Sequence, residues 1–76
     1  METFGVSKQG RIELIEARLD MARKSLYNLA LEKHFALATE DAQATERIDK
    51  QSVKIQKVIA LGEKVLAETK AEAEKE

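Results

Sequence analysis

The sequence lacks cysteine and proline, and it contains three glycines, two phenylalanines, one tyrosine and one histidine among 76 residues. Without cysteine there is no disulfide and no thiolate metal site, and a zinc site with a single histidine would need carboxylates almost exclusively. No glycine-rich nucleotide loop or nucleophile motif is present either, so we expect no metal and no cofactor. A chain of this size without a disulfide or a structural metal commonly gains stability by oligomerisation.

An excess of charge of one sign is also missing, since 13 basic residues face 14 acidic ones and the net charge is −1. A general nucleic-acid binder is expected to be strongly basic, so we do not expect nucleic acid as a partner. No apolar run approaches the roughly 18 residues that a membrane span requires. The first eight residues lack the layout of a signal peptide. We therefore expect a cytoplasmic protein without a membrane span.

Strong helix formers dominate the chain, and no strong helix breaker occurs between Arg11 and Leu61. The composition predicts an all-α fold. The segment 38–46 has no large apolar residue, and Thr39 followed by two carboxylates resembles the start of a helix. This predicts an antiparallel two-helix hairpin with helices at about 8–38 and 40–68. The alternative is one uninterrupted helix in a coiled coil.

The two ends of the chain are expected to behave differently from the hairpin at 8–68. Residues 1–7 are predicted to form an N-terminal hook, in which Ser7 caps the first helix and Phe4 and Val6 fold back. Residues 69–76 contain no large apolar side chain. Because this tail has nothing to bury, we expect it to be frayed or disordered.

The first helix carries apolar residues on two sides. A seam with coiled-coil spacing, interrupted only by Lys33, consists of Ile12, Ile15, Leu19, Ala22, Leu26, Leu29 and Ala36. A second stripe lies nearly opposite this seam at 100° per residue, and its large members are Leu14, Met21, Leu31 and Phe35. A helix that is apolar on two sides packs between two partners.

The second helix has one main apolar face, made of Ile48, Ile55, Val58, Ile59, Val65 and Leu66. It can cover only one side of the first helix. Leaving the second stripe in water would forgo about 1.5–3 kcal/mol for each large side chain. We therefore expect a homodimer in which two hairpins form a four-helix bundle. The alternative partner for the second stripe is a different protein.

Gly62 lies inside an otherwise strong helix, where glycine costs about 1 kcal/mol relative to alanine. We expect the first helix to approach closely at this point, near Leu19. The glycine would then leave room for the leucine side chain.

One side of the second helix carries a basic stripe, formed by Arg47, Lys50, Lys54, Lys57 and Lys64. It is either an ordinary solvated surface or a contact for a polyanion. No aromatic residues alternate with these cations for base stacking. Tyr27 and His34 offer the only conceivable catalytic chemistry, and neither has a predicted partner or pocket. The sequence therefore favours a non-enzymatic interaction or structural module, with a polyanion or nucleic-acid binder as the alternative.

Overall fold

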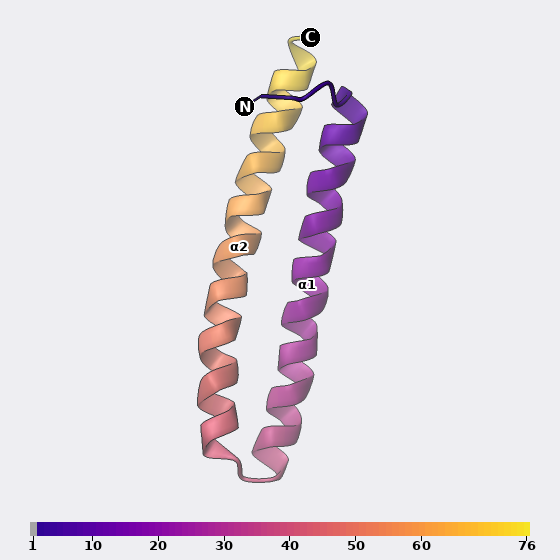
Figure 1. Cartoon of the computed structure of the whole chain (residues 1–76). Coiled ribbons are helices and arrows are strands. Elements are labelled where there is room, and N and C mark those ends of the chain that lie inside the picture. The colour runs from indigo at the N-terminus through magenta and orange to yellow at the C-terminus, as the bar shows by residue number, and fades with distance from the viewer. Residues whose placement is uncertain (1) are drawn as a thin grey trace.

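The computed structural model describes residues 2–76 and shows two long helices that run antiparallel, side by side (Figure 1). Helix α1 spans Lys8–Ala38 and helix α2 spans Ala42–Glu74. The two helices pack against each other along their length, and residues 2–76 contain no strand. The predicted all-α hairpin is confirmed, and the single uninterrupted helix is not formed.

The turn between the helices is three residues long and needs neither glycine nor proline. Glu40, which follows the α1 C-cap Thr39, adopts the left-handed conformation, with φ of 57°. The Glu40 amide donates to the Leu37 carbonyl at 3.2 Å, and the Asp41 amide donates to the Ala36 carbonyl at 2.9 Å. This pair of bonds is a Schellman motif, which satisfies the last carbonyls of a helix. Asp41 then caps α2, because its carboxylate accepts from the Ala44 amide at 3.0 Å.

The predicted seam of α1 forms the contact with α2. All of its apolar members are buried or half-buried, and Leu19 is only 3% exposed. On α2, Ile48 is the most deeply buried side chain, and it packs with Leu29 and Ala36. Lys33 interrupts the seam without leaving its charge unpaired, because its Nζ lies 2.7 Å from the Asp49 Oδ1 atom on α2.

At Gly62 the two helices lie too close together to leave room for a larger side chain. A Cβ atom added to Gly62 would lie 2.6 Å from Cδ2 of Leu19, which is well inside a normal carbon–carbon contact. The predicted close approach at Leu19 is confirmed. Glycine is required here by packing and not by backbone conformation.

The boundaries of α2 differ from the predicted 40–68. The helix starts at Ala42 because Asp41, and not Thr39, is its N-cap; the Thr39 hydroxyl instead donates back to carbonyls in the last turn of α1. The expectation of a frayed tail at 69–76 is wrong, since α2 continues to Glu74. Ala73 is buried there, and Glu76 pairs with Arg11 of α1. Small side chains thus suffice to keep the C-terminal end of α2 packed against α1.

The segment before α1, which we call the arm (residues 2–7), is only partly the expected hook. Ser7 is the N-cap, as predicted, because its hydroxyl accepts from the Gly10 amide at 3.0 Å. Phe4 does not fold back, since 83% of its surface is exposed.

Candidate interaction surface

An open apolar groove lies between the two helices in the half of the hairpin that holds the termini. It has a volume of about 400 Å³. Met21 of α1 and three side chains of α2, Val58, Leu61 and Val65, line it, with Leu19 among its other lining residues. Met21, Val58 and Leu61 are all more than half exposed. The hairpin thus forms this apolar groove but does not fill it.

The surface continues from the groove towards the turn and becomes polar there. A second hollow, of about 390 Å³, is lined by Ser25 and Asn28 of α1 and by Gln51 and Lys54 of α2. Asn28 follows Met21 by one heptad, and a residue one heptad away lies on almost the same side of a helix. The second hollow therefore belongs to the same side of the hairpin as the groove.

A third, smaller hollow of about 170 Å³ extends the same side towards the termini. Leu14 and Ile15 of α1 line it together with arm residues Glu2, Thr3 and Val6. Leu14 precedes Met21 by one heptad. These three hollows together form one broad side of the molecule, which we call the groove face.

The structure places the residues of the predicted second stripe in different surroundings. Leu14 and Met21 belong to the groove face, and Phe35, one heptad after Asn28, points to the same side and is 68% exposed. Leu31 is exposed and lines none of the three hollows. Leu14, Met21 and Phe35 of the stripe therefore lie along the flank where α2 residues join them around the groove face, whereas Leu31 lies outside these hollows.

Two α2 residues of the groove lie elsewhere than the sequence pattern predicts. The pattern places Val58 in the hairpin contact, but 57% of its surface is exposed. It places Leu61 on no apolar surface, although Leu61 is 61% exposed and lines the groove. The spacing of Val58, Leu61 and Val65, at i, i+3 and i+7, is the signal that indicates a second apolar side on α2.

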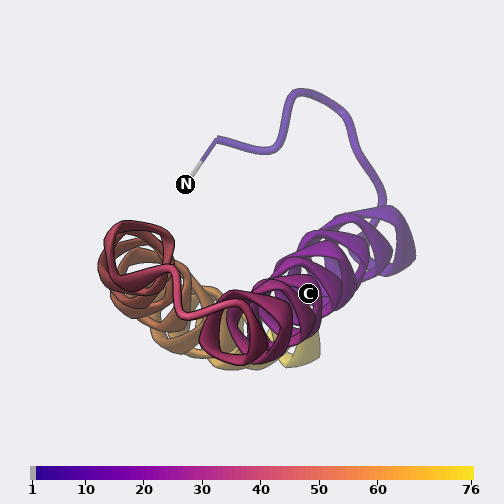
Figure 2. The ribbon, with the colours of Figure 1, turned by 90° about the horizontal axis from the view of Figure 1, so that it is seen from below.

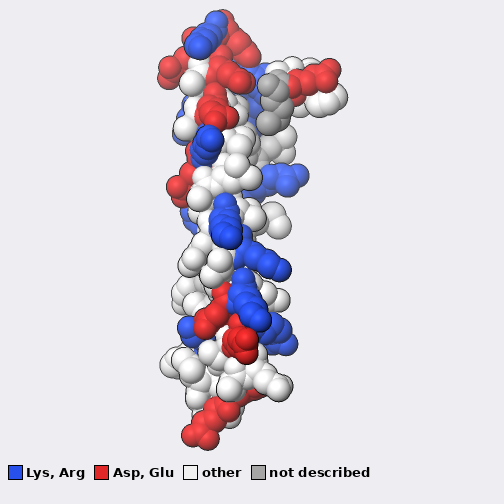
Figure 3. Space-filling view, turned by 90° about the vertical axis from the view of Figure 1, so that its left-hand side faces the viewer, with Lys and Arg blue, Asp and Glu red and all other residues white. Residues whose placement is uncertain are grey.

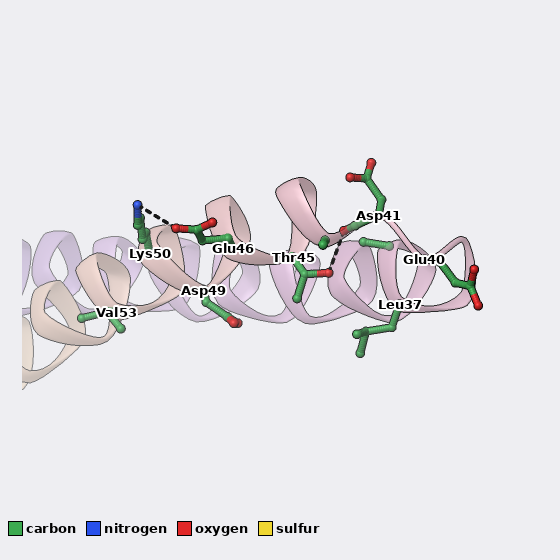
Figure 4. A pocket seen from close by; sticks show the side chains of 10 residues that line it. Leu37, Glu40, Asp41, Thr45, Glu46, Asp49, Lys50 and Val53 are labelled. Atoms are coloured by element: carbon green, nitrogen blue, oxygen red, sulfur yellow. Dashed lines mark hydrogen bonds and ion pairs between the residues drawn. The ribbon is translucent and has the colours of Figure 1, made fainter.

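The opposite face has its own hollow, close to the turn. This hollow measures about 700 Å³, and Leu37, Asp49 and Val53 are among the side chains that line it (Figure 4). Glu40, Asp41 and further carboxylates surround it. Leu37 lies on α1 and Val53 lies on α2, and both are exposed. Exposed apolar side chains therefore occur on both broad sides of the hairpin.

The five residues of the basic stripe are all exposed. Figure 3, which looks onto the α2 side of the hairpin, shows Lys and Arg gathered along the middle of this side and acidic residues towards its ends. Lys50 pairs with Glu46 at 3.3 Å, and among residues 2–76 the other four cations have no acidic partner within 4.0 Å. Lys54 also belongs to the polar part of the groove face.

Tyr27 and His34, the two residues with conceivable catalytic chemistry, line none of these hollows. Tyr27 and His34 are both exposed on α1, and His34 makes an edge-to-face contact with Phe35, at 6.1 Å between ring centroids. Within the described residues, no three His, Asp or Glu side chains are grouped as metal ligands. Neither helix is long and apolar enough for a membrane span.

Comparison of the chain with protein-family models, with curated proteins and with solved structures gave no match. The class of protein is therefore defined by its own geometry. It is a helical hairpin with an unfilled apolar groove on one broad side and a basic edge on α2.

Proposed function

We propose that this chain is a non-enzymatic helical interaction module that acts as a homodimer, in which two hairpins pack groove face against groove face as a four-helix bundle. The observation that carries the proposal is the exposure of Met21, Val58 and Leu61 around one groove. In a two-fold dimer both subunits bury their own copies of these three side chains. Burial of one such side chain contributes about 1.5–3 kcal/mol as an upper estimate, so the six in a dimer contribute about 9–18 kcal/mol against a cost of association of about 4–15 kcal/mol.

The size of the hairpin supports a second copy as the partner. Its extents are 54 × 18 × 15 Å, so the two larger extents give each broad side a footprint of roughly 970 Å². A standard interface buries about 800 Å² on each partner. The groove face alone is therefore large enough for a stable dimer.

The arrangement of polar residues also supports a bundle. Asn28, Gln51 and Lys54 lie between the apolar groove and Phe35 on the groove face. A polar layer of this kind within an apolar contact specifies register and oligomeric state in helical assemblies, at some cost in stability. In a homodimer of two such hairpins, the polar layer would fix the register of one hairpin against the other.

The proposal is tested by placing a charge on each broad side in turn. Met21→Asp puts an unpaired carboxylate in the proposed contact, whereas Val53→Asp makes a matched change at an exposed site on the opposite face. Sedimentation should give a dimer for the wild type and for Val53→Asp, and a monomer for Met21→Asp. The helical signal of Met21→Asp should persist, because its side chain is largely exposed in the single hairpin.

Three results would contradict the proposal. A wild type that sediments as a monomer at every concentration would remove the homodimer, and a groove-face partner would then have to be a different protein. A Met21→Asp variant that stays dimeric would remove the groove face as the contact. Loss of the dimer in Val53→Asp alone would move the contact to the opposite face.

A second candidate function rests on the basic stripe. The concentration of unpaired cations along the middle of α2 favours a contact with a polyanion, which need not displace a partner at the groove face (Figure 3). Changing Lys50, Lys57 and Lys64 together to Gln, none of which lines the groove face, should leave helicity and assembly intact and should abolish any retention on heparin. Retention that is insensitive to salt, or unchanged in the variant, would argue against this candidate.

A cytoplasmic location of the protein stays a prediction.

A further inference from the structure

The arm carries Phe4, the most exposed large apolar side chain of the described residues, and the backbone of Phe4 adopts an unfavourable conformation. The Val6 amide donates to the Thr3 carbonyl at 2.9 Å, which closes a tight turn over residues 3–6. Both central residues have positive φ, 52° at Phe4 and 79° at Gly5. Glycine adopts such angles freely, but a bulky residue does so only at a cost in free energy.

The turn is tied to the hairpin, so the position of Phe4 is defined. The Arg11 guanidinium donates to the Val6 carbonyl at 2.8 Å, and the same group pairs with Glu76 at the end of the chain. One arginine therefore joins the arm to both helices. The Val6 side chain lies against Gly10, since a Cβ atom at Gly10 would come within 3.1 Å of Val6 Cγ1.

The tethered arm stands on the groove face. Figure 2, seen from the turn end, shows it rising away from one broad side of the hairpin. Thr3 and Val6 line the terminal hollow with Leu14, whereas Phe4 takes no part in that lining and is 83% exposed. The ring is therefore presented outward, on the side where the apolar groove is left unfilled.

We infer that Phe4 of one subunit inserts into the apolar groove of a second copy of this chain, between Met21 on one wall and Val58 and Leu61 on the other. The inference rests on the proposed homodimer and adds to it an anchor that the helices themselves do not supply. A ring held outward by a fixed turn loses little freedom on binding, which is the property of an interface anchor. The cost of the positive φ at Phe4 is then offset by the burial of its ring.

The insertion also fixes how the two subunits are aligned. The arm and the groove lie in the same half of the hairpin, the half that holds the termini. Phe4 reaches the partner's groove only when the terminal halves of the two hairpins lie together, with both turns at the far end. This alignment places the polar layer of one copy, around Asn28 and Lys54, opposite the same layer of the other.

Two variants at Phe4 test the inference. Phe4→Gly removes the ring and at the same time suits the positive φ, so the hairpin itself should keep its helicity. Its dimer dissociation constant should rise by about thirty-fold or more, as for loss of an anchor residue. If the wild type dimerises and Phe4→Gly dimerises with the same affinity, Phe4 is not an anchor and the homodimer stands without it. If the wild type does not dimerise, the inference and the proposed function both fail.

The sequence contains no tryptophan, so Phe4→Trp gives a fluorophore at this one position. Its emission should shift to shorter wavelength over the concentration range in which the dimer forms, and Met21→Asp in the same chain should abolish the shift. A matched control, Val53→Trp, should show no dependence on concentration. A Phe4→Trp emission that is already blue-shifted in the monomer would show that the arm folds onto its own hairpin, and the inference would be wrong.

Discussion

Replacing Gly62 by alanine sets helix propensity against packing at one defined contact. Alanine gains about 1 kcal/mol over glycine inside a helix. The added Cβ, however, would lie 2.6 Å from Leu19 Cδ2 and 3.2 Å from Leu19 Cγ, in a side chain that is only 3% exposed. Carbon atoms in contact prefer about 3.5–4.0 Å, so the helices must separate or Leu19 must change rotamer. Overpacking of this kind costs about 1–3 kcal/mol, and Gly62→Ala should therefore lower the stability by up to about 2 kcal/mol.

The sign of the effect should reverse when the opposing side chain is shortened. In a Leu19→Ala background the conflicting carbons are absent, and Gly62→Ala should then raise the stability by about 1 kcal/mol through propensity alone. The four chains form a double-mutant cycle, measured by urea unfolding followed by circular dichroism at one protein concentration. Ala60→Gly, at an exposed position of α2, is the control and should cost about 1 kcal/mol in both backgrounds. An equal effect of Gly62→Ala in the two backgrounds would refute the close approach as the reason for the glycine.

Two further changes test other parts of the hairpin. Glu40→Gly should stabilise the chain by about 0.5–1 kcal/mol, because glycine adopts the left-handed conformation of the turn without strain, and a lower urea midpoint would contradict the Schellman geometry. Ending the chain after Glu68 should lower the melting temperature, since it removes the buried Ala73 and the partner of Arg11. An unchanged melting temperature would instead support a tail that contributes nothing.

The hairpin and its seam could be predicted from the sequence because they follow from periodicity. The 3–4 spacing from Ile12 to Ala36 selects the buried side of α1 whatever partner covers it, and the structure buries that side. The turn was placed correctly, but its chemistry was not. Thr39 and Asp41 can both cap a helix. The left-handed φ of Glu40 makes Asp41 the N-cap of α2, and no sequence pattern predicts that φ.

The groove could be predicted only in part, because it depends on how two helices are rotated against each other. The sequence places Met21 in the second stripe of α1, whereas its neighbours across the groove, Val58 and Leu61, lie on α2. Helical periodicity assigns residues to a side of one helix. It does not say which flank of that side meets the neighbour. The same limit explains the tail, where Ala73 is buried through the position of α1 and not through its own size.

The three-residue turn also has a consequence for the order in which the hairpin closes. Contacts next to the turn, such as that between Lys33 and Asp49, join short loops, whereas Arg11 and Glu76 are 65 residues apart. Loop closure costs more entropy as the loop grows, so folding should begin at the turn and proceed like a zipper towards the termini. Hydrogen exchange should accordingly slow from the termini to the turn. The apolar groove lies in the terminal half, which closes last and opens first. A partner bound at the groove would therefore stabilise the part of the hairpin that is most prone to open.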